Sequence, residues 1–322
     1  MPEKFTAAVV QDCSVVFDRE KTIEKLVRLT AEAAGGGAKL VLVPEAFVSG
    51  YPKGLDFGTR VGGRSPEGMD EFRRYYDSAL DLDGPGSAAI GTAARENNVH
   101  LAVGVIERGG ETLYCTVGLW GPDGELLSRH RKLMPTAMER LIWGYGDGST
   151  LTVTDTPLGR IGAVICWENY MPLLRTAMYS KGVQIYLAPT ADSRDTWLPT
   201  MQHIAREGGC YVLSTCQYLT RGDCPEDYDA IQGNAPETVL MSGGACIISP
   251  HGEVLAGPHF DGPAILTAEI DLGEITRAKF AFDVVGHYAR PDVFRLHVDE
   301  RPMPPVVHTA ADPRDSDHGG RE

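Results

Sequence analysis

Hydrophobic residues at the start of the chain form two continuous runs separated by a run with helical spacing. The sequences FTAAVV, from Phe5, and KLVLVPE, from Lys39, are almost uninterrupted apolar runs, as expected for strands covered on both faces. Between them, apolar positions recur every three to four residues, which predicts a helix. These positions are Ile23, Leu26, Val27, Thr30 and Ala34. We expect Asp18 to cap this helix and the three glycines at 35–37 to end it.

The later pattern mixes helix–strand units with hairpins. An irregular stretch covers 50–68, and turn residues stand at 121–124, 157–159 and 250–252. Helices are predicted over 69–77, 88–97, after 166, over 201–207 and over 272–279. Strands are predicted over 100–107, 112–120, 125–133, 151–156, 160–167, 185–190, 211–218, 244–250, 253–257 and 264–270. This mixture does not fit a uniformly parallel barrel and predicts layered sheets with helices outside.

The organisation along the chain predicts one large domain. The sequence shows no internal repeat and no linker between two cores, so we assign residues 1–290 to a single domain. From about Tyr288 the chain becomes rich in proline, aspartate and histidine. We therefore expect residues 291–322 to form a C-terminal arm that ends in a flexible tail.

Composition narrows the classes of function and the expected location. The formal net charge is −14, and an acidic surface disfavours nucleic acid and anionic membrane as partners. No apolar run approaches the roughly 20 residues that span a bilayer. The seven cysteines include no CxxC pair, and the N-terminus lacks the apolar stretch of a signal peptide. These features predict a cytoplasmic protein with free thiols.

Cys166 is the first candidate for chemistry. It follows the apolar run RIGAVI and precedes a polar turn and a helix with Pro172 in its opening turn. A cysteine on such a strand-to-helix turn would face the positive end of the helix dipole, which favours thiolate. Backbone N–H groups of the turn would serve as an oxyanion hole. The alternative is a buried cysteine that only packs in the core.

Three charged residues are the other candidates, and each has an ordinary alternative. Glu45 ends an apolar run, where burial would raise its pKa toward the range useful for proton transfer. Alternatively, it simply meets solvent there. Lys132 ends the run ELLSRHRK and would otherwise be a solvated strand end. Glu139 follows seven residues later and would otherwise be an ordinary surface acid.

Taken together, these residues carry a specific resemblance. The segments LVPEAFVSGYPKG, HRKLMPTAMERLIWGYGDGST and GRIGAVICWENYMPL resemble the three catalytic motifs of the nitrilase superfamily, in the same order. The likeness extends from Phe5 to about Val306 and is closest to the nitrilase branch, especially its plant-type members. The resemblance implies that Glu45 is the general base, Lys132 the catalytic lysine, Cys166 the nucleophile and Glu139 a fourth member of the site.

The same resemblance implies a fold, an assembly and a substrate class. The fold is an α/β four-layer α-β-β-α sandwich that pairs into an αββα-αββα homodimer and often extends into spiral homo-oligomers. Trp167 and Glu168 follow the cysteine as they do in nitrilases, which favours nitriles over amides. The implied reaction converts an organic nitrile to the carboxylic acid and ammonia, with some amide as a by-product. It requires no cofactor.

The substrate pocket and the alternative functions remain open from the sequence. Several aromatic residues near the motifs are candidates to line a pocket, as is one histidine; the alternative for each is structural packing. They are Tyr51, Trp143, Trp167, Trp197 and His203, with Tyr218 beside them. An amidase, a carbamoylase or a cyanide-degrading enzyme would use the same three residues, and a non-catalytic scaffold is the remote alternative. Scattered histidines without HExxH disfavour a metal hydrolase, and the absence of GxSxG disfavours a serine hydrolase.

Overall fold

Two six-stranded sheets form the centre of the molecule. The computed structural model describes residues 4–307. The first sheet has the strand order β16-β1-β2-β5-β6-β7, with parallel pairing around β2 and antiparallel pairing at both edges. Its strands are β1 (Lys4–Gln11), β2 (Ala38–Val48), β5 (His100–Gly109), β6 (Thr112–Trp120), β7 (Leu126–Arg131) and β16 (Ala264–Asp271).

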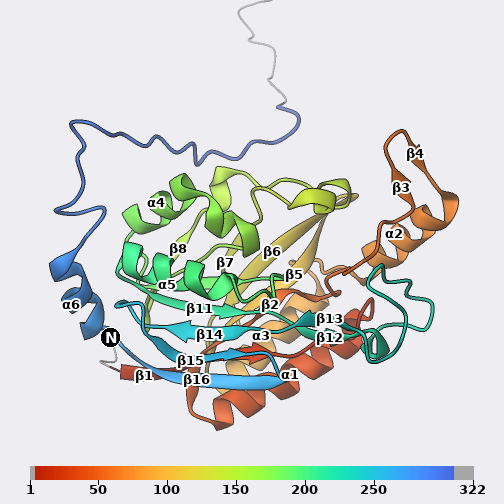
Figure 1. The fold of residues 1–322 in the computed structure, drawn as a ribbon, viewed down its shortest axis with the longest axis horizontal. Coiled ribbons are helices and arrows are strands. Elements are labelled where there is room, and N and C mark those ends of the chain that lie inside the picture. The colour runs from red at the N-terminus through yellow and green to blue at the C-terminus, as the bar shows by residue number, and fades with distance from the viewer. Residues whose placement is uncertain (1–3, 308–322) are drawn as a thin grey trace, which may run out of the picture.

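The second sheet has the same general design. Its order is β15-β14-β11-β10-β9-β8, again with parallel pairing in the middle and antiparallel edges. Its strands are β8 (Val153–Thr156), β9 (Gly159–Ala163), β10 (Ile185–Pro189), β11 (Tyr211–Thr215), β14 (Ala245–Ile248) and β15 (Val254–His259). Because β16 returns to pair with β1, the last strand within residues 4–307 completes the first sheet (Figure 1).

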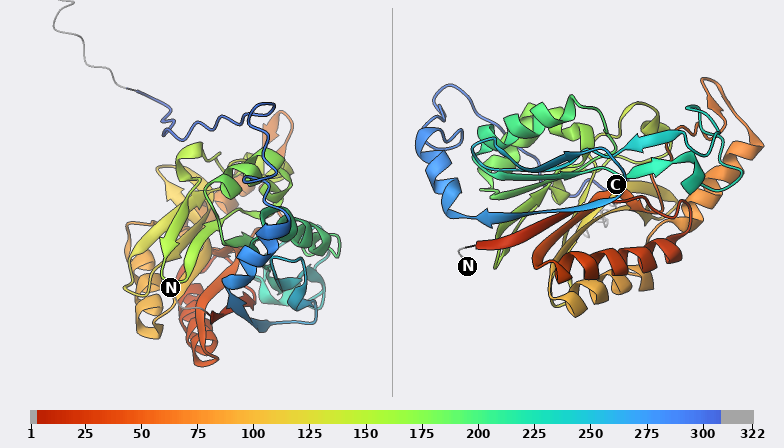
Figure 2. Two further views of the ribbon diagram at one scale, coloured as in Figure 1. Left: turned by 90° about the vertical axis from the view of Figure 1, so that its left-hand side faces the viewer. Right: turned by 60° about the horizontal axis from the view of Figure 1, so that its bottom comes forward.

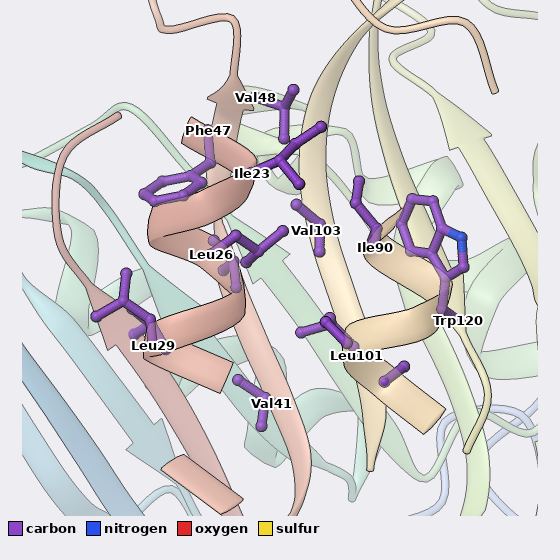
Figure 3. Close-up of a cluster of buried hydrophobic side chains, with 14 of the residues drawn as sticks. Ile23, Leu26, Leu29, Val41, Phe47, Val48, Ile90, Leu101, Val103 and Trp120 are labelled. Atoms are coloured by element: carbon purple, nitrogen blue, oxygen red, sulfur yellow. The ribbon is translucent and has the colours of Figure 1, made fainter. Parts of the chain in front are cut away.

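Helices cover the outer face of each sheet, which gives the predicted α-β-β-α sandwich (Figure 2). Helices α1 (Arg19–Gly35) and α3 (Pro85–Asn97) cover the first sheet. Helices α4 (Pro172–Ser180) and α5 (Trp197–Gly208) cover the second. Three apolar cores result, and Figure 3 shows the one between α1, α3 and the first sheet.

Strand β2 shows how the sequence serves two cores at once. Leu40 and Leu42 face the second sheet, whereas Val41 and Val43 face the helices. Successive strand residues point to opposite faces, so a continuous apolar run is needed when both faces are covered. All four side chains are fully buried. The expectation of a doubly covered strand is thereby confirmed.

Helix α1 begins and ends where the sequence predicts. The Asp18 side chain accepts a hydrogen bond from the backbone N–H of Lys21, and the helix ends at Gly35. Ile23, Leu26 and Thr30 are buried, as expected. The buried face also includes Leu29 and Ala33, whereas Val27 and Ala34 are only partly buried and lie at its margins. The apolar face is therefore slightly rotated from the predicted one.

Short elements around one end of the sandwich depart from the sequence-based expectation. The irregular stretch contains a two-stranded ribbon, β3 (Thr59–Arg60) and β4 (Gly63–Arg64), and helix α2 (Pro66–Ser78) starts before 69. A second ribbon, β12 (Tyr218–Thr220) and β13 (Val239–Ser242), was not predicted either. Residues 4–307 also contain four 3-10 helices: η1 (Ala137–Leu141), η2 (Gly148–Thr150), η3 (Cys166–Tyr170) and η4 (Arg221–Asp223).

After α6 (Gly273–Ala281) the chain continues without helix or strand to residue 307. This segment lies along the molecule near α4 (Figure 1) and is held by an ion pair of 2.6 Å between Lys181 and Glu300 and by a hydrogen bond from Met303 N–H to Asp147.

The flexible tail predicted beyond it falls on 308–322, outside the described residues. The assignment of 1–290 to one domain stays a prediction. Within 4–307, no helix is long and apolar enough to cross a membrane.

Candidate active site

Glu45 lies at a break in the pairing of β2 with β5. Val43 pairs with Val103 and Val48 pairs with Val105, so four residues of β2 lie opposite the single residue Gly104. This bulge carries the Glu45 carboxylate out of the regular strand alternation. The run does not end at Glu45 as expected, because β2 continues to Val48. Glu45 is fully buried, and burial raises the pKa of its carboxyl, against the opposing effect of the Lys132 charge.

The bulge depends on the absence of a side chain at Gly104. A Cβ there would lie 2.1 Å from the Pro44 carbonyl oxygen and 2.7 Å from the Glu45 Cα. Gly104→Ala should therefore push the Glu45 backbone aside. We expect kcat to fall by about 100-fold and the free energy of unfolding to fall by roughly 1–3 kcal/mol. Steady-state kinetics and thermal unfolding measure both effects.

Gly35→Ala is the matched control, because a Cβ at Gly35 meets nothing within 4 Å. It should leave kcat unchanged and be neutral or slightly stabilising at the end of α1. Full activity in the Gly104 variant would contradict the positioning of Glu45 by this close approach.

Lys132 joins two carboxylates in the interior. It follows β7, and its Nζ donates to Glu45 Oε1 and to Glu139 Oε2, both at 2.8 Å. Its side chain is fully buried, and its Nζ lies 5.5 Å from the centre of the Trp143 ring. Burial alone would lower the pKa of this ammonium, but the surrounding carboxylates hold it well above its usual value. Lys132 is therefore a fixed positive charge and not a solvated strand end.

Glu139 is likewise not a surface acid. It lies in η1, is buried, and accepts hydrogen bonds from three donors. These are Lys132 Nζ, the Thr136 backbone N–H at 2.6 Å and the Tyr51 hydroxyl at 2.6 Å. A carboxylate with three donors has no freedom to swing, so it fixes the position of Lys132.

Cys166 stands at the turn between β9 and η3 with a left-handed backbone, φ 52°. Such a conformation is costly for a non-glycine residue and recurs where a side chain must be presented at a site. Burial and the Glu45 charge raise the pKa of its thiol to about 12, which contradicts the expected preference for thiolate. One reason is that α4, the helix whose dipole was expected to favour thiolate, begins only at Pro172, six residues after the cysteine. The folded site holds a thiol whose proton must be removed during attack.

A buried pair that sequence reasoning missed ties the cysteine turn to the lysine strand. The Glu168 carboxylate accepts from the Ile165 N–H at 3.0 Å and from the Leu133 N–H at 2.6 Å, one residue away from Cys166 and Lys132 respectively. It also lies 3.1 Å from His130 Nε2. Glu168 was noted only for its resemblance to nitrilases, and the HRK run gave no sign that His130 faces inward.

Two further side chains that sequence reasoning missed contact the site. The Cys115 thiol on β6 lies 3.4 Å from Glu45 Oε1. The Thr190 hydroxyl, just after β10, lies 3.2 Å from Cys166 Sγ. Cys115 lies within an apolar strand and Thr190 directly follows one, so their positions in the sequence mark them as ordinary core residues, and only the folded arrangement distinguishes them.

A cavity of about 200 Å³ opens at Cys166. Of the residues predicted to line the pocket, Tyr51 and Trp167 line it. Trp143 is buried beside Lys132 and Tyr51. Trp197 is buried in α5, where its indole N–H donates to Ser214 Oγ at 2.9 Å. The His203 side chain is 63% exposed and lies 3.5 Å from Glu207, so the structure does not bring it into this cavity.

A buried cysteine, glutamate and lysine brought together by an α-β-β-α sandwich define the class of the protein. The model of the carbon–nitrogen hydrolase family matches residues 6–280, and the chain belongs to that family. It is similar to several nitrilases. It is 56% identical to an aliphatic nitrilase of Sinorhizobium fredii, over 95% of this chain and 99% of the relative. It is 53% identical to the bifunctional nitrilase/nitrile hydratase NIT4A of Lupinus angustifolius, over 95% of this chain and 89% of the relative.

A solved structure supports the fold. The carbon–nitrogen hydrolase from Helicobacter pylori G27 superposes with a TM-score of 0.71 at 20% identity, covering 91% of this chain and 97% of that one. The resemblance to the nitrilase superfamily seen in the sequence is thus confirmed, as is the predicted fold class.

Proposed function

We propose that the protein hydrolyses an organic nitrile to the carboxylic acid and ammonia, with Cys166 as the nucleophile. The observation that carries the proposal is the state of Glu45. Its Oε1 is held by Lys132, whereas its Oε2 is buried without a hydrogen-bond partner within residues 4–307. A buried carboxylate oxygen with no partner is costly and requires an explanation, and we assign this atom as the acceptor of the Cys166 thiol proton. The nitrilase relatives support the choice of substrate class.

In the first step, Glu45 takes the thiol proton as Cys166 Sγ bonds to the nitrile carbon. One C–N π bond breaks, and the nitrogen receives the proton to give a covalent thioimidate. Lys132 lies next to the base and stabilises negative charge that develops on the nitrogen. Because the pKa of the thiol is raised to about 12, proton removal by Glu45 and attack belong to one event.

In the second step, water adds to the thioimidate carbon with Glu45 again as base. Breaking the C–N bond releases ammonia and leaves a thioester, which a second water hydrolyses to the acid. Breaking the C–S bond instead releases an amide. One site therefore yields both products, in keeping with the bifunctional names of several relatives. Glu139 holds Lys132 in place throughout, and no step needs a cofactor.

The cavity walls favour a substrate with an apolar body. A second hollow of about 420 Å³ shares Tyr51, Lys53, Thr136 and Glu139 with the cavity at Cys166. It adds apolar side chains: Leu55, Phe57, Met138, Leu141, Ile142 and Ile231. We assign Tyr51 and Trp167 to the walls around the nitrile group, and the second hollow to the rest of the molecule.

We also propose that the chain works as a homodimer or larger homo-oligomer in the cytoplasm. Large apolar side chains are exposed on α4, on α6 and in the segment after it, including Leu173 at 68%, Phe280 at 89% and Phe294 at 78%. Exposed apolar groups in such number are typical of surfaces that pair with another chain. All seven cysteines are free, as expected in a reducing compartment.

The test is ammonia release with product analysis from matched nitriles and amides. The panel contains phenylacetonitrile, 3-phenylpropionitrile, a short dinitrile, β-cyanoalanine and cyanide, each organic nitrile beside its amide. We expect acid, with a minor amide fraction, from one or more organic nitriles and no turnover of added amides. Turnover of amides alone would assign an amidase, and turnover of cyanide alone a cyanide-degrading enzyme; either result would refute the proposal.

A further inference from the structure

Thr190 is placed against the sulfur of the proposed nucleophile. It follows β10 in the second sheet and is buried, with 1% of its surface exposed. Its Oγ1 lies 3.2 Å from Cys166 Sγ, and its backbone N–H donates to the Thr215 carbonyl at 3.0 Å. The backbone contact ties Thr190 to β11, so the hydroxyl approaches the sulfur from a fixed strand end.

The direction of the Thr190 hydroxyl proton follows from its contacts. A threonine hydroxyl has one proton to donate and two lone pairs. The Asp192 N–H donates to Oγ1 at 2.9 Å and so occupies one lone pair. Within the part of the chain that the structure describes, Cys166 Sγ is the acceptor that this buried proton can reach. A buried hydroxyl proton without an acceptor is unfavourable, so it points at the sulfur.

The turn after Thr190 is itself anchored beside the cavity. The Asp192 carboxylate accepts from the Trp167 indole N–H at 2.8 Å and pairs with Arg194. Asp192 and Arg194 line the cavity at Cys166, as does Trp167. The Asp192 N–H that orients the Thr190 hydroxyl is thus held by a contact with the residue that follows the cysteine.

We propose that Thr190 is a further catalytic residue, whose hydroxyl donates a hydrogen bond to Cys166 Sγ and stabilises the thiolate as it forms. The proposal rests on Cys166 being the nucleophile. Because the Thr190 hydroxyl donates a hydrogen bond to the sulfur, the thiol's own proton points away from Thr190 and is free to pass to Glu45. A hydrogen bond to a neutral thiol is weak, whereas one to a thiolate is charge-assisted. The contact therefore strengthens during attack, which is what accelerates a reaction.

The test compares Thr190→Val, which keeps the shape but removes the hydroxyl, with Thr190→Ser, which keeps the hydroxyl. The rate of Cys166 alkylation by iodoacetamide is measured in the full chain from pH 6 to 10. Trypsin cleaves after Arg160 and Arg175, so the peptide 161–175 reports Cys166 alone among the seven cysteines. Far-UV circular dichroism and the thermal midpoint establish that each variant is folded.

Below the pKa of the thiol, the alkylation rate follows the thiolate fraction. The alkylation rate of Thr190→Val should therefore be about 10- to 100-fold lower than that of the parent chain at every pH, which is the usual effect of losing a hydrogen bond to a charged group. Thr190→Ser should stay within about 3-fold of the parent chain. With a nitrile substrate, kcat should fall in Thr190→Val while KM changes little. If Thr190→Val does not fold, Thr190→Ala replaces it in the same comparison with serine.

Equal alkylation rates in the hydroxyl-free variant and the parent chain would overturn the proposal. Equal losses in Thr190→Val and Thr190→Ser would also overturn it, since the serine keeps the donor. The alkylation readout does not need a nitrile. A chain that turns over no nitrile but shows the expected difference in alkylation would therefore refute the proposed substrate class and support the role of Thr190.

Discussion

Cys166→Ala should abolish nitrile hydrolysis, with a loss on the order of 10⁵- to 10⁶-fold in kcat, because removing the nucleophile of a covalent catalytic unit disables the whole unit. The fold should survive. Alanine keeps the Cβ, so the left-handed backbone is no more strained than with cysteine. The lost contact is the one to the Thr190 hydroxyl at 3.2 Å. Ammonia release and the thermal midpoint measure the two effects.

Cys210→Ala is the matched control for this prediction. Cys210 is also fully buried and free, but it packs among α4, α5 and the second sheet. Its replacement should cost roughly 1 kcal/mol of stability through the small cavity left behind, and it should leave kcat unchanged. Normal turnover by the Cys166 variant, or complete loss in a folded Cys210 variant, would remove Cys166 from the role of nucleophile.

Glu45→Gln should lower kcat by about 10²- to 10⁴-fold, the usual contribution of a general base. The substitution keeps the shape and a partner for Lys132, which also retains the Glu139 carboxylate. What disappears is the acceptor for the thiol proton, which an amide cannot replace. Ammonia release from a nitrile substrate measures this loss.

The pH profile sharpens the test of Glu45. Burial raises the pKa of this carboxyl above the usual value of about 4.5. The base acts as a carboxylate, so activity should be lost as the pH falls through the raised pKa, and the acid limb should lie closer to neutrality than for an exposed glutamate. This limb should be absent from the residual activity of Glu45→Gln. Glu24→Gln, at an exposed position on α1, should keep the parent profile; an unchanged acid limb in Glu45→Gln would exclude this base.

The sequence was enough to predict the layers of the fold, but it did not reveal the buried pair of Glu168 and His130. A continuous apolar run such as that of β2 indicates a strand that packs into a core on each face, and this signal is strong. Glu45, Lys132 and Cys166 were proposed as site residues from their motifs, because alone each had an ordinary alternative. The short ribbons β3–β4 and β12–β13 were missed, since their strands of two to four residues carry no period to detect.

Contacts between distant strands could not be read from local patterns. Thr190 directly follows an apolar strand and Cys115 lies in the middle of another, so neither stands out as functional in the sequence. Their importance depends on which neighbour faces them across the site. The thiol pKa was misjudged for the same reason: the helix dipole is a local effect, whereas burial near Glu45 is a property of the assembled sandwich.

Each of the three motifs proposed to be catalytic contains a non-glycine residue with a left-handed backbone. Ala46 has φ 49°, Ala137 φ 46° and Cys166 φ 52°. Ala46 follows Glu45 directly, and Ala137 precedes Glu139 by two residues. Each such residue costs roughly 1–3 kcal/mol. The site is therefore held in place by the surrounding packing, which offsets this cost.

The pairing of β1 with β16 has a consequence for folding during synthesis on the ribosome. Among the strands of residues 4–307, β1 is synthesised first and its antiparallel partner β16 last. All eight residues from Lys4 to Gln11 pair with the stretch that ends at Asp271. Until that stretch emerges, the outer edge of the first sheet has open hydrogen-bonding groups next to an apolar face. Exposed edges of this kind invite pairing between nascent chains. Synthesis of residues 264–271 thus closes the edge, and a chain that ends before Ala264 should be prone to aggregation.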